Sequence, residues 1–148
     1  MKTAVMAALG LLALGSQAHA TGGFSCTASD ETLRFQIDGV VPHGFGSPVI
    51  EASGNLAYQP TDGQPPISQF TFGKSNISQY WNRDGVLNLV IYKESYEGDT
   101  YETMVVVETR TKDEGETYLG TYKVSTSQQV NGDPFTHSAE GEVRCSQD

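Results

Sequence analysis

The stretch that decides the fold is residues 137–145, which read His-Ser-Ala-Glu-Gly-Glu-Val-Arg-Cys. Small or apolar residues alternate here with polar ones, so that Val143 and Cys145 fall on one side and Glu142 and Arg144 on the other. Successive side chains of a β-strand point to opposite faces of the sheet, so a period of two predicts a strand with one buried face. The segment therefore predicts a strand whose inner face carries a cysteine.

The same alternation recurs between residues 24 and 124 and predicts seven further strands. Turn residues separate many of these runs, at Asp38-Gly39, Asp84-Gly85, Gly98-Asp99, 112–115 and Asn131-Gly132. Only residues 75–82 suggest a short helical turn. We expect a single all-β, antiparallel domain of about eight strands, folded as a closed barrel or a curled sandwich. The predicted inner faces carry Phe24, Cys26 and Ala28; Leu33, Phe35 and Ile37; Ile50, Ala52, Gly54, Leu56 and Tyr58; Phe70 and Phe72; Leu87, Leu89 and Ile91; Tyr101, Thr103, Val105 and Val107; Tyr118, Gly120, Tyr122 and Val124.

The only two cysteines, Cys26 and Cys145, lie on the inner faces of the first and last predicted strands. In an exported chain an even pair of cysteines is most simply a disulfide. A disulfide holds its two Cα atoms within about 7 Å, so the first and last strands must meet. This favours a barrel over a sandwich.

Residues 1–20 have the features of a secretory signal peptide. Lys2 precedes an apolar run over residues 4–15, and Ala18-His19-Ala20 provides small residues at a cleavage site. The run is shorter than the roughly 20 residues that span a bilayer. We therefore expect residues 21–148 to form one domain in the periplasm or outside the cell. Charged residues on the predicted outer faces argue against membrane insertion.

The composition is acidic, with 18 Asp and Glu residues against 9 Lys and Arg residues and a net charge of −9. The basic residues are scattered along the chain, and the overall sign repels phosphate backbones, so nucleic-acid binding is disfavoured. A negative surface speeds the encounter with a cationic partner. The charge therefore favours a cationic protein as partner, although it also serves solubility alone.

No motif for catalysis or metal binding stands out. The chain lacks a Gly-x-Ser-x-Gly nucleophile elbow, and its histidines beyond residue 20, His43 and His137, are too few for a zinc site. Acidic residues around one predicted hairpin could pair for glycoside hydrolysis, or simply form a solvated tip. We expect no catalytic residue, no metal and no cofactor. The acidic group consists of Glu94, Glu97, Asp99 and Glu102.

Several aromatic residues lie at predicted loops or strand ends, where large rigid side chains are suited to anchoring a partner. Trp81 is the only tryptophan and could instead cover an open end of the barrel. The function that we expect is an exported, non-catalytic, inhibitor-like binding module that recognises a cationic protein. An apolar-ligand carrier and a glycosidase are the alternatives. The candidate partner-binding residues are Trp81, Tyr80, Tyr96, Phe45, Glu97 and Asp99.

Residues 53–58, Ser-Gly-Asn-Leu-Ala-Tyr, are similar to the Ser-Gly-x-x-Tyr loop of exported lysozyme-inhibitor barrels. Tyr58 lies one position later than in that pattern. In a strand, a shift of one residue moves a side chain to the opposite face. Since we place Tyr58 on an inner face, we do not assign the chain to that family.

Overall fold

Antiparallel strands make up nearly all of the chain that the structure describes, which is residues 21–42, 48–59, 67–95, 100–111, 116–130 and 133–148. The structure is a computed structural model. These residues form nine strands and one short 3-10 helix, η1. Their bounds are β1 Thr21–Ser29, β2 Leu33–Pro42, β3 Glu51–Tyr58, β4 Ile67–Gly73, η1 Lys74–Asn76, β5 Ile77–Arg83, β6 Val86–Ser95, β7 Thr100–Arg110, β8 Thr117–Val130 and β9 Asp133–Gln147.

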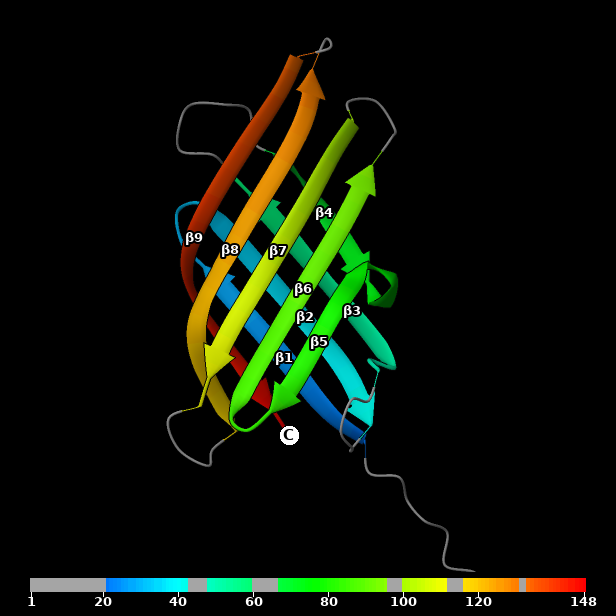
Figure 1. The fold of residues 1–148 in the computed structure, drawn as a ribbon, viewed down its shortest axis with the longest axis vertical. Helices are drawn as coiled ribbons and strands as arrows, with labels where there is room; N and C mark the ends of the chain where they lie inside the picture. Colours follow the sequence, from blue (N-terminus) through cyan, green and yellow to red (C-terminus); the bar gives the residue numbers. More distant parts are fainter. Residues whose placement is uncertain (1–20, 43–47, 60–66, 96–99, 112–115, 131–132) are drawn as a thin grey trace, which may run out of the picture.

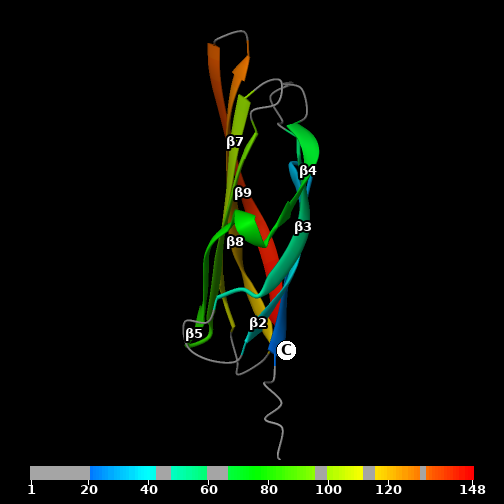
Figure 2. The ribbon, with the colours of Figure 1, turned by 90° about the vertical axis from the view of Figure 1, so that its right-hand side faces the viewer.

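The strands form one sheet in the order β4-β3-β2-β1-β9-β8-β7-β6-β5, and every neighbouring pair is antiparallel. The sheet curls until it is nearly closed into a barrel. Strands β5 to β9 form the near layer in Figure 1, and β1 to β4 cross behind them. Figure 2 shows the two layers face to face. The predicted all-β antiparallel domain is confirmed.

The cysteines predicted that the first and last strands meet, and in the structure β1 and β9 are paired. Cys26 and Cys145 are directly opposite each other in this pair, with Cα atoms 4.0 Å apart, and their sulfur atoms form a disulfide. Beside it, the N–H of Asp148 donates to the carbonyl of Gly23 at 3.1 Å. The two ends of the described chain are therefore joined side by side in the middle of the sheet.

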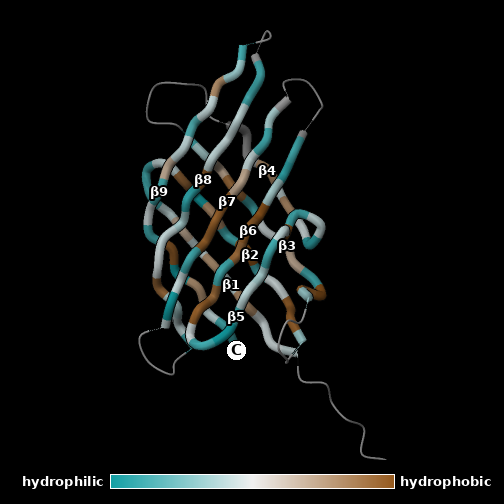
Figure 3. Tube along the Cα trace, viewed as in Figure 1, coloured by the Kyte–Doolittle hydropathy of each residue, from teal (hydrophilic) through white to brown (hydrophobic). Residues whose placement is uncertain are grey.

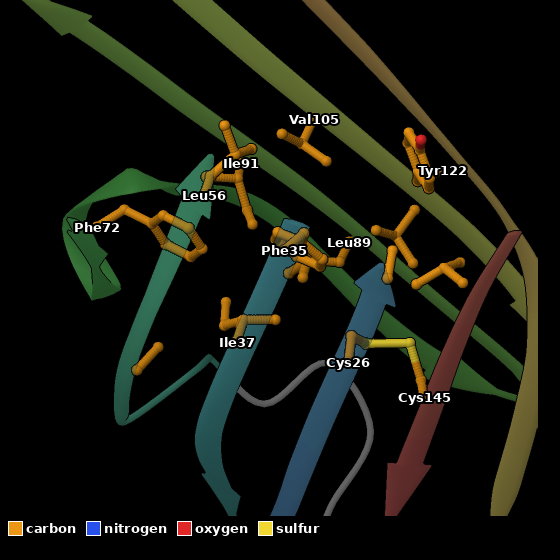
Figure 4. Packing of buried hydrophobic residues seen from close by; sticks show 14 of the residues in the cluster. Cys26, Phe35, Ile37, Leu56, Phe72, Leu89, Ile91, Val105, Tyr122 and Cys145 are labelled. Carbon is orange, nitrogen blue, oxygen red and sulfur yellow. A yellow bond between two sulfur atoms is a disulfide. The ribbon is translucent and has the colours of Figure 1, made fainter. Parts of the chain in front are cut away.

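The core lies between the two layers and is built from the inner faces of the strands. Figure 3 shows hydrophobic and hydrophilic residues alternating along them, and Figure 4 shows the buried side chains meeting between the layers. Phe35 stacks on Phe72 with ring centroids 6.0 Å apart. At one end, the hydroxyl of Tyr122 donates to Oδ2 of Asp30 at 2.5 Å, tying β8 to the turn between β1 and β2.

The barrel remains open between its edge strands, β4 and β5, and we call this gap the seam. Side chains bridge part of it in place of backbone hydrogen bonds. The ammonium group of Lys93 on β6 donates to the carbonyl of Thr71 on β4 at 2.6 Å and lies 5.1 Å from the ring centroid of Phe70. The amide of Asn76 in η1 donates to the carbonyl of Tyr92 at 3.2 Å.

The ninth strand is the main correction to the sequence-based prediction. Residues 75–82 were expected to hold a helical turn, but only η1 is helical and Ile77–Arg83 forms β5. The inward positions of β5 carry Tyr80 and Asn82, opposite Leu89 and Leu87 of β6. Such polar and amphipathic residues give no period-two hydrophobic signal, so the strand is formed through its pairing with β6.

Two local expectations also differ from the structure. Asp38-Gly39 was expected to form a turn but lies within β2, where Gly39 leaves room for a ring: a Cβ at this position would lie 2.2 Å from a carbon of Phe24. Ile50 was expected to face inward but precedes β3 and is 47% exposed. The turn at Asp84-Gly85 is confirmed, with positive φ at both residues. The other predicted turns, at 98–99, 112–115 and 131–132, lie outside the described residues.

Candidate binding surface

The outer face of strands β5 to β8 brings together side chains from four separate parts of the sequence. Because side chains alternate along each strand, the antiparallel register lines up outward residues in rows across the sheet. One row consists of Trp81, Asn88, Glu108 and Thr121. The row beside it consists of Arg83, Val86, Arg110 and Leu119. This face is turned toward the viewer in Figure 1.

Between these rows lies an open groove of about 380 Å³. This volume lies within the range of roughly 300–1,000 Å³ that is typical of small-ligand sites. Trp81 is the cross-strand neighbour of the lining residue Asn88. The groove is lined by Val86, Asn88, Glu108, Thr109, Arg110, Leu119, Gly120 and Thr121.

Gly120 lines the groove at a point where the backbones of β7 and β8 approach closely. A Cβ atom on Gly120 would lie only 2.0 Å from the carbonyl oxygen of Glu108 on the neighbouring strand. No real side chain tolerates such a distance, so the backbones of β7 and β8 approach as they do only because residue 120 is glycine.

Large apolar side chains are exposed around the groove. The side chain of Trp81 is 53% exposed and that of Leu119 is 48% exposed. Trp81 therefore does not cover an end of the barrel, because it lies on the outer face of an edge strand. Exposed tryptophan beside a concavity is a preferred anchor for a bound molecule, since it offers a large area at a small cost in conformational entropy.

The polar groups of the groove are available for a ligand. The Oδ1 atom of Asn88 is buried and has no hydrogen-bond partner among the described residues. Buried polar atoms are paired in the great majority of cases, so an unpaired one in a residue that lines a groove points to a missing donor. The exposed side chains of Glu108 and Arg110 likewise have no side-chain hydrogen bond or ion pair within the described part of the chain.

The charges on this surface are mixed. The row with Arg110 continues to Arg144 on β9, and the row with Glu108 continues to Glu142. The acidic surplus of the protein is more evident at the opposite end of β6 and β7, where Glu94 and Glu102 are directly opposite each other. Like charges in such a cross-strand pair destabilise the sheet slightly.

The other candidate residues do not join Trp81. Tyr80 points to the opposite side of β5, and its ring packs 4.9 Å from the ring of Phe24. Burial, followed by the nearby Tyr118, raises the pKa of the Tyr80 hydroxyl to about 12. Tyr80 therefore belongs to the barrel interior. The remaining candidates, Phe45, Tyr96, Glu97 and Asp99, lie outside the described residues.

Sequence reasoning identified Trp81 but missed the groove residues beside it. Asn88, Glu108, Arg110 and Leu119 belong to strands that the alternation predicted, and that alternation also places them outward. Their convergence depends on the register of four strands and on the close approach at Gly120, which no single segment encodes.

The described ranges contain no cluster of three or more His, Cys, Asp or Glu residues that could hold a metal ion. His137 was expected near the start of a strand; it is half-buried and lies four positions into β9. No helix within these ranges is long and apolar enough to cross a membrane.

Comparison with known proteins gave no match: no family model, no curated protein and no solved structure is significantly similar to this chain.

Proposed function

We propose that this protein is an exported, non-catalytic binding module, and that its binding surface is the groove on the outer face of β5 to β8 with Trp81 beside it. The observation that carries the proposal is the unpaired, buried Oδ1 of Asn88 next to an indole that is 53% exposed. An exposed indole and an unsatisfied acceptor both lower their free energy when a ligand covers them.

The two alternatives receive less support. Aromatic rings such as Phe24, Phe35 and Phe72 occupy the interior that an apolar ligand would need. The interior also contains the buried hydroxyls of Thr103 and Thr126, which have no hydrogen-bond partner in the part of the chain that the structure describes. An apolar ligand would leave them unsatisfied. A glycosidase uses two carboxylates about 5–10 Å apart, and the lining of the groove includes one.

A cationic protein remains our proposal for the partner on the basis of net charge alone. The net charge of −9 attracts a positive molecule over long range. The groove itself contains both Glu108 and Arg110, so it does not select one sign of charge. Net charge therefore bears on how fast a partner arrives, and the groove bears on how tightly it is held.

Affinity capture tests the proposal. The purified protein is immobilised and exposed to envelope extract or extracellular fluid, in parallel with the variants Trp81→Ala and Phe135→Ala. Phe135 is a matched control because it is also an exposed aromatic residue but lies on β9, away from the groove. We expect capture to be lost with Trp81→Ala and retained with Phe135→Ala. Equal capture by both variants would mean that this surface is not the binding surface.

A salt series separates the two parts of the proposal. If net charge guides the partner, capture should weaken as ionic strength rises above about 0.15 M, where screening acts within about 8 Å. If capture does not change with salt but still requires Trp81, the surface is correct and the cationic partner is wrong.

A further inference from the structure

We propose that the ligand of this groove is a carbohydrate, an uncharged oligosaccharide with one or two pyranose rings in contact with Trp81 and Asn88. This inference rests on the binding surface proposed above, and it assigns the groove a neutral ligand in place of the cationic protein, for which net charge is the sole support. It follows from the hydrogen-bonding pattern of the groove, from its aromatic side chain and from its size.

The hydrogen-bonding groups of the groove require a ligand that both donates and accepts. Asn88 Oδ1 needs a donor, and the carboxylate of Glu108 accepts only. The guanidinium of Arg110 donates only, whereas the hydroxyl of Thr121 can do either. A sugar presents hydroxyl groups on successive carbons, and each of them can donate or accept. It can therefore satisfy all four side chains without bringing a charge of its own into the site.

The mixed charges argue against ligands with a net charge. An anion suited to Arg110 would be repelled by Glu108, two residues away on the same face of β7. A cation suited to Glu108 would be repelled by Arg110. Because neither side chain is paired with another group among the described residues, an uncharged ligand can use both of them in charge-assisted hydrogen bonds.

The aromatic side chain suits the apolar face of a sugar ring. A pyranose exposes several C–H groups on one face, and these pack against an indole ring while the hydroxyl groups at the rim remain free to bond with polar neighbours. Trp81 lies directly across from Asn88 in the β5–β6 pair, so one ring can contact both residues. The groove volume of about 380 Å³ leaves room for a ring of this kind and part of a second.

The tryptophan content of the chain makes this site directly observable. Trp81 is the only tryptophan, so intrinsic tryptophan fluorescence reports on this groove and on no other part of the protein. The probes are neutral oligosaccharides of glucose, mannose, xylose and N-acetylglucosamine, a charged oligosaccharide of glucuronic acid, and a set of short peptides of both charge signs. Each is titrated into the protein while fluorescence and the heat of binding are recorded.

We expect at least one neutral oligosaccharide to shift the emission of Trp81 and to release a matching heat. Trp81→Ala should weaken this binding about tenfold or more, as expected when a central aromatic anchor is removed. Calorimetry measures the affinity of this variant, because it has no tryptophan fluorescence. Asn88→Ala should weaken it about three- to tenfold through loss of one hydrogen bond. Phe135→Ala should leave binding unchanged.

The outcomes distinguish the two levels of the proposal. If only peptides bind, and Trp81→Ala abolishes that binding, the surface is correct and the carbohydrate inference is overturned. If oligosaccharides bind but Trp81→Ala and Asn88→Ala have no effect, the sugar binds elsewhere and the inference is also overturned. If no probe of either class binds at millimolar concentration, both the inference and the proposed function of the groove are refuted.

Discussion

The substitution Tyr122→Phe removes one hydroxyl from the contact that ties β8 to the turn between β1 and β2. The ring of Tyr122 is buried and would keep its packing, so the change isolates the 2.5 Å hydrogen bond to Asp30. A hydrogen bond to a charged group contributes about 1.5–3 kcal/mol. Because Asp30 is exposed to solvent, we expect a loss at the low end of that range, about 1.5 kcal/mol at neutral pH.

The loss should depend on pH because the acceptor is a carboxylate. Burial acts to raise the pKa of Asp30, but hydrogen bonds from Tyr122 and from the N–H groups of Leu33 and Thr32 outweigh it, and the pKa falls below its usual 3.8. A group whose pKa is lower in the folded state stabilises the fold above its unfolded pKa, and this contribution is lost as the pH falls through the folded pKa. The effect of Tyr122→Phe should shrink as the pH falls through the folded pKa of Asp30, because a protonated carboxyl leaves only a neutral hydrogen bond, worth about 0.5 kcal/mol.

Urea unfolding of the wild type, Tyr122→Phe, Asp30→Asn and the double variant, at neutral pH and at about pH 2.5, measures both quantities. The two single changes should be non-additive at neutral pH, since both remove the same contact. Additive effects, or an effect of Tyr122→Phe that is equally large at both pH values, would refute the role of the charged hydrogen bond.

Further predictions concern the disulfide, the close approach of β7 and β8 at Gly120, and the contact of Lys93 across the seam. Replacing Cys26 and Cys145 together by alanine should lower the free energy of unfolding by up to about 4–5 kcal/mol, because the disulfide spans 119 residues; wild type measured in reductant should give the same value, and no change would contradict this account. Gly120→Ala should lower the free energy of unfolding, measured by thermal unfolding, by more than about 3 kcal/mol. Gly73→Ala is the control, because its Cβ would lie 3.5 Å from its nearest neighbour, and it should lower that free energy by less than about 1 kcal/mol. Lys93→Met should lower the free energy of unfolding by about 1 kcal/mol. It should also speed amide hydrogen exchange in β4, because the ammonium of Lys93 donates to a carbonyl of that strand. Unchanged exchange in β4 would show that this contact does not hold the seam.

The residues of the interior were the most predictable part of the fold. The sequence alternates between apolar and polar residues in strands such as Leu33-Arg34-Phe35-Gln36-Ile37, and there the odd positions are buried and the even ones are exposed. The closure was predictable because two cysteines fell on inner faces of the first and last strands. Both inferences depend only on period-two alternation and on the short reach of a disulfide.

Neither β5 nor the groove could be predicted from period-two alternation and the cysteine pair. Residues 77–83 carry Tyr80 and Asn82 where a typical strand would carry aliphatic residues, so β5 is recognised only once β6 is in place beside it. The groove combines residues that are about forty positions apart in the sequence, from Trp81 to Thr121. The sequence predicted Trp81 as a contact residue, but not which neighbours would complete the proposed surface.

The covalent link between neighbouring strands β1 and β9 also determines how the protein responds to mechanical force. A tether attached at Thr21 and Asp148 transmits tension through Cys26 and Cys145, which lie a few residues from those two positions. Strands β2 to β8 lie within the bridged loop and carry none of this tension while the sulfur–sulfur bond is intact. Stretching an oxidised molecule should therefore release only its short tails, and a reduced molecule should extend along its whole length.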